Sequence, residues 1–174
     1  MRDRGTHQTD PVEGAHRMIR PATPADVPTI MGFVRDLAEY ERASDKVVAT
    51  EPLLHDALFG DHPAAEALIA EQDGMAVGMA LYFFNFSTWT GWRGLYLEDL
   101  YVTPEARGSG VGTQLLRHLA GVAIDRGCAR FEWAVLDWNE PAIRFYDAMG
   151  AESLDDWRIR RVSGPALATL AGRG

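Results

Sequence analysis

The apolar residues of this chain recur with two spacings, and each spacing predicts one type of element. Recurrence every three or four positions gives a helix one apolar face, whereas alternation or a continuous run suits a strand. A capping residue followed by proline marks a helix start, and glycine marks a helix end. The expected helices run from Thr23 to about Tyr40 or Glu41, from Thr50 to Gly60, from Val111 to Gly127 and from Asn139 to Gly150.

Apolar runs between these helices predict strands, and Asp73-Gly74 between two of the runs is a strong hairpin signal. The order is strand, two helices, three strands, helix, strand, helix, strand. It predicts an α/β fold, a mixed sheet with helices on both faces. The expected strands cover residues 19–21, 67–71, 75–86, 93–102, 131–136 and 157–162.

The length of 174 residues suits one domain with a sizeable core. Hydrophobic residues at 47% and charged residues at 24% are ordinary for a soluble globular protein. Residues 1–17 are polar, have no periodic pattern and lack the apolar core of a signal peptide. We therefore expect residues 1–17 to be a disordered extension, or sequence upstream of a true start at Met18, and residues 18–174 to form a single domain.

The net charge of −8 argues against a nucleic-acid partner and fits a cationic small-molecule substrate better. A single cysteine, Cys128, excludes an internal disulfide and fits a reducing cytoplasm. One cysteine and five scattered histidines make a zinc site improbable, so we expect no metal. No apolar run approaches the roughly 18 residues of a membrane span, so no membrane partner is expected.

The stretch Leu95–Thr113 holds the most informative chemistry: an acid-bearing strand, then a glycine-spaced loop, then a helix. Such a junction can hold a phosphate with backbone N–H groups and the helix dipole. A Walker loop needs a Gly-Lys-Ser/Thr ending, which is absent, and a dinucleotide fingerprint needs another glycine spacing. Two interpretations remain, an Arg-x-x-Gly-x-Gly loop at Arg107, Gly110 and Gly112, or a glycine-rich turn that merely begins a helix.

The Arg-x-x-Gly-x-Gly loop resembles the pyrophosphate loop of the GNAT acetyltransferases. Together with other segments it makes the chain similar to the GNAT superfamily, and within it to the diamine (spermidine/spermine) acetyltransferases. The resemblance spans nearly everything from Met18 to about Val162, and the Tyr-Leu-Glu-Asp and Trp-Asn-Glu-Pro segments make it specific. The segments that carry it are Ile19–Thr23, Leu37–Glu41, Tyr96–Asp99, Arg107–Gly112 and Trp138–Tyr146.

This resemblance implies a GNAT fold with a mostly antiparallel sheet, acetyl-CoA as the donor, and a homodimer. It implies that the backbone of Leu100, Tyr101 and Val102 pairs with the pantetheine arm like an extra strand. Tyr146 would lie near the thioester sulfur. The residues expected around the pyrophosphate and the rest of the cofactor are Arg107, Gly108, Ser109, Gly110, Val111, Gly112, Thr113, Asn139, Pro141 and Ala142.

Direct transfer of an acetyl group to an amine needs a base, because an alkylamine with a pKa of about 10.4 arrives protonated. Glu98 is the candidate base, acting directly or through a water. A backbone N–H near Leu100 could stabilise the developing oxyanion. Tyr146, a phenol with a pKa of about 10, is the candidate acid for the leaving thiolate. Each residue also has a plainer interpretation: Tyr146 could be a core aromatic, and Arg107 could pair with a surface acid.

Alternation along a regular strand would send Glu98 and Asp99 to opposite faces, so both can face one pocket only if the strand is bulged. The polyamine-acetylating members place an acid just ahead of a Trp before this strand, where this chain reads Phe86-Ser87-Thr88-Trp89. One anchor for a long polycation is therefore missing, and a diamine, thialysine or a lysine-like amino acid is as plausible as spermidine. The candidate substrate residues are Tyr40, Glu41, Glu98, Asp99, Glu132 and Asp155.

An amine N-acetyltransferase is the expected function. The alternatives are an enzyme that acetylates proteins or antibiotics, and an acyl-CoA-binding module that kept the fold without turnover. Glu98 and Tyr146 favour the enzyme, since a binding module would need neither residue.

Overall fold

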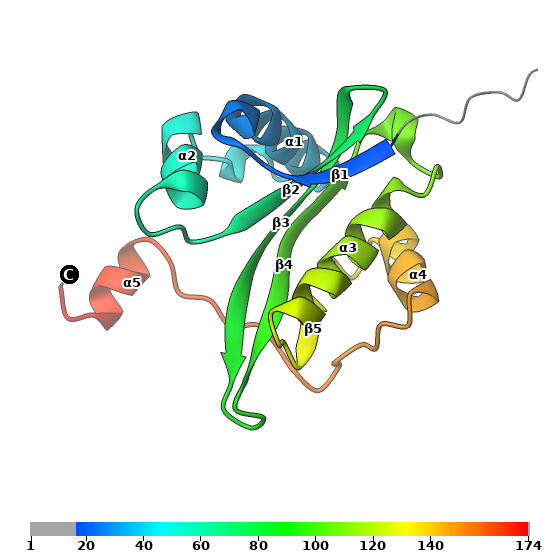
Figure 1. Ribbon diagram of the computed structural model, residues 1–174. Helices are drawn as coiled ribbons and strands as arrows, with labels where there is room; N and C mark the ends of the chain where they lie inside the picture. The colour runs from blue at the N-terminus through cyan, green and yellow to red at the C-terminus, as the bar shows by residue number, and fades with distance from the viewer. Residues whose placement is uncertain (1–16, 174) are drawn as a thin grey trace, which may run out of the picture. The chain divides into compact units, whose positions relative to one another are not determined.

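The computed structural model describes residues 17–173, which form two compact units, one ending at Ala134 and the other beginning at Val135 (Figure 1). The first unit is a five-stranded sheet with helices. Its strands are β1 (Arg17–Pro21), β2 (Glu66–Gln72), β3 (Met75–Ser87), β4 (Trp92–Val102) and β5 (Arg130–Trp133). Its α-helices are α1 (Val27–Tyr40), α2 (Glu51–Phe59) and α3 (Val111–Asp125), and its short 3-10 turns are η1 (Pro24–Asp26), η2 (Ser44–Lys46) and η3 (Pro104–Ala106).

The strands lie in the order β1-β2-β3-β4-β5. The first four are antiparallel to their neighbours, and β5 pairs with β4 in parallel. The expected mixed, mostly antiparallel sheet is thus confirmed. The hairpin between β2 and β3 turns at Asp73 and Gly74, whose φ angles of 52° and 78° lie in the left-handed region that glycine tolerates best. β1 begins at Arg17, two residues before the strand expected over 19–21, so Arg17 belongs to the fold and not to the expected extension. Residues 1–16 lie outside the described residues.

Each face of the sheet packs against different helices (Figure 1). On one face, Ile30 and Phe33 of α1 pack with Ile69, Met79 and Tyr101 of the sheet. The other face packs against α3 and holds the side chains that alternate with this set. Leu115 and Leu119 of α3 and Leu68, Leu95 and Leu97 of the strands are buried there. The expectation of helices on both faces is confirmed.

Helix starts follow the expected capping signals. Asp26 accepts hydrogen bonds from the Thr23 backbone N–H at 2.7 Å and from the Thr23 hydroxyl at 2.8 Å. These bonds close the first turn before α1. α3 begins after Gly110, whose φ of 92° is in the left-handed region.

The second unit contains α4 (Glu140–Ala148) and α5 (Pro165–Leu170). Asn139 caps α4 as expected, because its side-chain oxygen accepts a hydrogen bond from the Ala142 backbone N–H at 3.4 Å. The predicted strand over residues 157–162 is wrong, since the segment is neither helix nor strand and its apolar side chains are exposed. The strand predicted over 131–136 is β5, which ends at Trp133, and α5 was not anticipated. No helix among residues 17–173 is long and apolar enough to cross a membrane.

Candidate active site

β4 carries one residue more than β3 across their pairing. Leu81 lies opposite Asp99, and the next residue, Tyr82, lies opposite Leu97, so Glu98 is the extra residue of a β-bulge. Leu81 packs against the core on the α1 side, and cross-strand partners share a face. Asp99 therefore lies on the α1 face. Because of this bulge, the adjacent acids Glu98 and Asp99 need not point to opposite faces of the sheet.

Asp99 is half-buried among acids, whereas Glu98 is exposed. Burial, followed by the negative charges of Glu98 and Glu41, raises the pKa of Asp99 to about 6. Burial also raises the pKa of Glu41, which follows the last residue of α1. The two acids of β4 and the acid after α1, hereafter the acid cluster, make a site where a positive charge would be stabilised.

The pairing of β4 with β5 ends after Leu97. β5 pairs with β4 only along Gly94–Leu97, while β3 occupies the opposite side of β4 along its whole length. Beyond Leu97, no strand among the described residues pairs with the β5 side of β4. The backbone of Leu100, Tyr101 and Val102 runs along this edge, which suits an extended ligand that carries amides.

The glycine loop lies between η3 and α3. Ser109 is held in the loop, because its hydroxyl donates to the Ala106 carbonyl at 2.6 Å and its own carbonyl accepts from Nη1 of Arg17. Gly108 and Gly110 have φ angles of 73° and 92°, and Gly110 supplies no side chain to cap α3. The first N–H groups of α3, from Val111 to Thr113, have no intrahelical acceptor, so this end of the helix suits an anion.

Arg107 lies between the β4 edge and the loop. Its Nε donates to the Val102 carbonyl at 3.0 Å. Its guanidinium carbon lies 5.3 Å from the ring centroid of Tyr40 and 6.0 Å from that of Tyr101. The Tyr101 hydroxyl donates to Oδ2 of Asp36 at 3.3 Å, and burial raises its pKa. Arg107 is thereby fixed beside two aromatic rings while its side chain remains exposed.

Glu132, expected in the wall of the substrate pocket, has its own partners in the first unit. Its Oε2 lies 2.9 Å from Nε of Arg130 and accepts a hydrogen bond from Nδ2 of Asn85 at 3.1 Å. Arg130 also donates to Oδ1 of Asn85 at 3.3 Å. The charge of Glu132 is therefore balanced within the fold.

The remaining predicted residues belong to the second unit. Tyr146 is half-buried on α4, with its ring centroid 5.3 Å from that of Phe145. Asn139 caps the same helix, Pro141 lies in its first turn and Ala142 donates to the cap. Asp155 is exposed in the segment after α4. A single short helix thus presents four of the predicted cofactor residues together.

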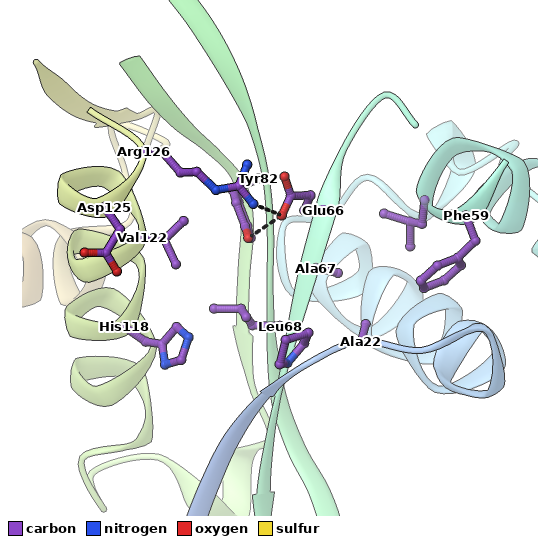
Figure 2. A pocket seen from close by; sticks show the side chains of 12 residues that line it. Ala22, Phe59, Glu66, Ala67, Leu68, Tyr82, His118, Val122, Asp125 and Arg126 are labelled. Carbon is purple, nitrogen blue, oxygen red and sulfur yellow. Dashed lines mark hydrogen bonds and ion pairs between the residues drawn. The ribbon is translucent and has the colours of Figure 1, made fainter. Parts of the chain in front are cut away.

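A separate cavity of about 290 Å³ lies beside α3, on the first unit (Figure 2). One part of its polar wall is internally paired, because Oε2 of Glu66 accepts from the Tyr82 hydroxyl at 3.0 Å and lies 3.6 Å from Nη2 of Arg126. Burial and Glu66 raise the pKa of Tyr82. None of the predicted site residues lines this cavity. Its lining is Pro21, Ala22, Leu58, Phe59, Glu66, Ala67, Leu68, Tyr82, His118, Val122, Asp125 and Arg126.

Comparison with known proteins decides the family. The family described as acetyltransferase (GNAT) matches residues 32–151, which include β4, the glycine loop and α4. The chain belongs to the GNAT acetyltransferase family. Within residues 17–173, no group of three or more His, Cys, Asp or Glu side chains is placed to hold a metal ion.

Relatives of this GNAT chain are named for small amines. It is 42% identical over 167 residues to the thialysine N-epsilon-acetyltransferase of Sus scrofa, with 90% of this chain and 98% of the relative covered. It is 31% identical over 203 residues to the L-ornithine N5-acetyltransferase of Arabidopsis thaliana, with 89% of each covered. The spermidine/spermine N(1)-acetyltransferase-like protein 1 of Homo sapiens is 35% identical over 88% of this chain, but only 23% of that longer protein is covered.

Solved structures show the same GNAT fold. An integron cassette protein from the mobile metagenome of V. cholerae superposes with a TM-score of 0.75 at 28% identity, covering 89% of this chain and 97% of that chain. A ribosomal-protein-alanine N-acetyltransferase from Brucella melitensis superposes with a TM-score of 0.67 at 21% identity, with 86% and 100% covered. The second likeness supports the fold alone.

Sequence reasoning missed two contacts in this GNAT fold, the pairing of Glu132 with Arg130 and the hydrogen bond from Tyr101 to Asp36. The family resemblance places Glu41 and Asp99 in one set of substrate residues, and the structure adds that Glu41 raises the pKa of Asp99.

Proposed function

We propose that this GNAT protein transfers the acetyl group of acetyl-CoA directly to a primary amine of a small cationic substrate. The acceptor is a lysine- or thialysine-like amino acid, a diamine or a polyamine. The observation that carries the proposal is that three features lie on β4 or directly after it. They are the acids of the acid cluster on β4, the backbone edge of β4 beyond Leu97, and the glycine loop at the start of α3. The names of the thialysine, ornithine and spermidine/spermine relatives support the class of acceptor.

The described residues fit acetyl-CoA, which when bound supplies an activated acetyl thioester. Leu100, Tyr101 and Val102 offer backbone N–H and C=O groups to the amides of the pantetheine arm. Residues 108–113 offer backbone N–H groups to the pyrophosphate, and Arg107 adds a positive charge. Asn139, Pro141 and Ala142 contribute from the first turn of α4.

Two residues carry the proton transfers. Glu98 accepts the proton of the substrate ammonium, directly or through a water, so that the nitrogen lone pair becomes the nucleophile. The new bond joins nitrogen to the acyl carbon as the bond from that carbon to sulfur breaks. Tyr146 donates its phenolic proton to the leaving sulfur, and the second proton that the nitrogen loses as the amide forms returns through water to the Tyr146 phenolate. A backbone N–H near Leu100 stabilises the carbonyl oxygen as it gains charge.

Asp99 is the second candidate for the base, because a pKa of about 6 places it closer to neutral pH than an ordinary carboxyl. In the proposal it binds the ammonium beside Glu98. The two assignments separate in kinetics: loss of the base lowers kcat, whereas loss of a binding charge raises KM.

The compact acid cluster favours a short acceptor. It presents its carboxylates together rather than along a channel, and the loop before β4 has no acid ahead of Trp89. Glu132, which could have added a further anchor, is balanced by Arg130. Tyr40, at the end of α1, and Asp155 complete the set of proposed substrate residues.

The experiment that tests this function follows the release of CoA thiol from acetyl-CoA with a panel of thialysine, lysine, ornithine, putrescine, spermidine, an aminoglycoside and a lysine peptide. Short amines are expected to give the highest kcat/KM. If CoA binds and no acceptor raises thiol release above background, the protein is an acyl-CoA-binding module. If only the peptide or the aminoglycoside is acetylated, the alternative acceptor classes replace the proposed one.

Tyr146→Phe tests the proposed acid. We expect turnover to fall about 100-fold while acetyl-CoA binding, measured by calorimetry, changes little, since only the proton donor is lost. Tyr82→Phe is the matched control, because it removes a buried hydroxyl that belongs to the cavity beside α3. Unchanged turnover in Tyr146→Phe would remove Tyr146 from the mechanism.

A homodimer and a cytoplasmic location complete the proposal. The homodimer follows from the family resemblance, and the location from the single Cys128. The mass of the purified protein in solution tests the homodimer, and fractionation of the native host tests the location.

A further inference from the structure

β1 carries two arginines, and only one of them is paired with carboxylates. Nη1 of Arg20 lies 2.7 Å from Oδ2 of Asp26, and Nη2 of Arg20 lies 2.6 Å from Oε1 of Glu71. Arg17, three residues earlier, takes part in none of the ion pairs within residues 17–173. Side chains three positions apart on a strand point to opposite faces. Since Arg20 meets Asp26 at the start of α1, Arg17 lies on the face that packs against α3.

The Arg17 guanidinium contacts the glycine loop that precedes α3. Its Nη1 donates a hydrogen bond to the Ser109 carbonyl and lies 3.9 Å from the position that a Cβ on Gly110 would take. Its Nε is buried, and no described residue accepts a hydrogen bond from it. A guanidinium with an unpaired N–H and no carboxylate in contact is stabilised by a nearby anion, because its positive charge is delocalised over all three nitrogens.

The contact with Arg17 also fixes the direction of one peptide group in the loop. The C=O and the N–H of a trans peptide point in opposite directions. Because the Ser109 carbonyl is directed at Arg17, the Gly110 N–H of the same peptide is directed away from it. Without Arg17 this carbonyl loses its donor, and a rotation of the peptide would turn a partly negative oxygen toward an anion at the start of α3.

The charge of the whole chain makes positive charges beside this loop important. A net charge of −8 repels an anion such as CoA at long range. Arg107 directly precedes the loop, and its Nε donates to the Val102 carbonyl. Arg17 reaches the same loop from the first strand. Two positive charges from distant parts of the sequence therefore lie beside the backbone N–H groups that the pyrophosphate would meet.

We propose that Arg17 is a positioning residue for the phosphates of CoA. It holds the Ser109 carbonyl away from the pyrophosphate, so that the Gly110 N–H faces it, and its positive charge attracts the phosphates through space. The inference rests on the proposed use of acetyl-CoA. Because Arg17 takes no part in the proton transfers, its loss affects the Kd for CoA and the KM for acetyl-CoA rather than kcat.

Calorimetric titration with CoA is the first test. Arg17→Met keeps the aliphatic stem and removes the charge and the donor, so the Kd should rise about tenfold, whereas Arg17→Lys keeps both and should raise it about threefold. Arg117→Met is the matched control, because it removes an exposed arginine of α3 more than one turn beyond the helix start. An unchanged Kd in Arg17→Met, or an equal loss in Arg117→Met, overturns the proposal.

Truncated ligands separate a positioning role from general damage to the fold. Arg17→Met should weaken the binding of CoA and of 3′-dephospho-CoA by the same factor, because both ligands contain the pyrophosphate. Pantetheine, which has no phosphate and is measured by competition with CoA, should bind parent and variant equally. The effect on CoA should also shrink between about 50 mM and about 500 mM salt, because salt screens the attraction. An equal loss of pantetheine binding overturns the positioning role.

These measurements stay separate from the acetylation assay. A protein whose CoA affinity depends on Arg17 as expected, but which releases no thiol with any acceptor, supports the inference and removes the proposed function. A protein that acetylates an amine, while Arg17→Met leaves both the Kd for CoA and the KM for acetyl-CoA unchanged, keeps the function and overturns the inference. A parent protein that binds no CoA overturns both.

Discussion

Asp26 and Asp99 are both aspartates of the first unit, but the charged side chains that act on them have opposite signs. Asp26 is 9% exposed, and its carboxylate accepts from both terminal nitrogens of Arg20, at 2.7 and 2.8 Å. The hydrogen bonds from Arg20 hold the pKa of Asp26 well below its usual range, with further help from Thr23. Asp99 is half-buried, and the acids Glu98 and Glu41 act with burial to raise its pKa to about 6.

The difference teaches how to separate a structural acid from a candidate functional one. The fold gives Asp26 an arginine, which in turn pairs with Glu71 at 2.6 Å, so no external group is needed. Near Asp99 the charges that raise its pKa are negative, so a cation from outside would lower the free energy of the cluster. Burial alone does not distinguish the two residues, because both lose hydration. The sign of the neighbouring charge distinguishes them.

The largest expected effect is on stability, at Asp26. Asp26→Asn leaves the Arg20 guanidinium without its carboxylate and should lower the free energy of unfolding by about 3 kcal/mol. Urea unfolding followed by circular dichroism measures it. Asp99→Asn, the matched change, should leave stability unchanged or raise it, since it removes a charge repelled by its neighbours. Equal destabilisation by the two variants would break the comparison.

The next effect is on catalysis. Glu98→Gln should lower kcat for the best amine about 100-fold, equivalent to about 2.7 kcal/mol, because an amide cannot accept the ammonium proton. Steady-state release of CoA thiol measures kcat. Asp26→Asn, assayed under conditions in which it stays folded, is the control and should leave kcat unaltered. If Glu98→Gln changes only KM while Asp99→Asn lowers kcat, the role of base passes to Asp99.

The pH dependence of kcat/KM should show whether the ionised form of Asp99 contributes to the reaction. Since its pKa is about 6, the ratio of kcat/KM between the parent protein and Asp99→Asn should fall about tenfold per pH unit below pH 6. The ratio cancels the protonation of the free amine, which is common to both proteins. A ratio that stays flat between pH 5 and pH 8 would show that ionised Asp99 contributes nothing to amine acetylation.

The same two acids should act in opposite directions on the pH dependence of stability. The pKa of Asp99 is higher in the folded chain than its ordinary 3.8, so the folded state binds the proton more tightly and Asp99 stabilises the fold as pH falls from about 6 toward 4. The pKa of Asp26 is lowered by folding, so its contribution is present above about pH 4 and is lost as pH falls further. Unfolding curves of the two asparagine variants against pH measure both slopes.

The smallest expected effect is at Glu41. Glu41→Gln removes one of the charges that act on Asp99, so the pH at which the kcat/KM ratio falls should move downward by less than one unit. KM for the amine should rise about threefold, because one attraction at surface distance is lost. Glu39→Gln, two residues earlier on α1, is the control. A larger change with Glu39→Gln than with Glu41→Gln would remove Glu41 from the acid cluster.

Much of the fold could be predicted because its signals are local. The helix starts at Thr23, Thr50 and Asn139, the Asp73-Gly74 hairpin and the loop before α3 each depend on a few consecutive residues. The strand wrongly predicted over 157–162 had an alternating pattern, but strand formation also requires a neighbouring strand, and no local pattern shows whether one is in place. The alternation of apolar and polar side chains indicates that one face of a segment favours burial. It does not indicate whether another part of the chain packs against that face.

The sequence by itself determined the order of the elements as far as α4, the glycine loop and the adjacent acids, since capping, periodicity and motif spacing act over a few residues. Only the tertiary structure decided that Glu98 is the bulged residue, that Glu41 acts on an acid 58 positions away, and that Arg130 and Asn85 hold Glu132. Charges interact through space rather than along the chain, so the field around a carboxylate is defined only after the sheet has brought distant segments together.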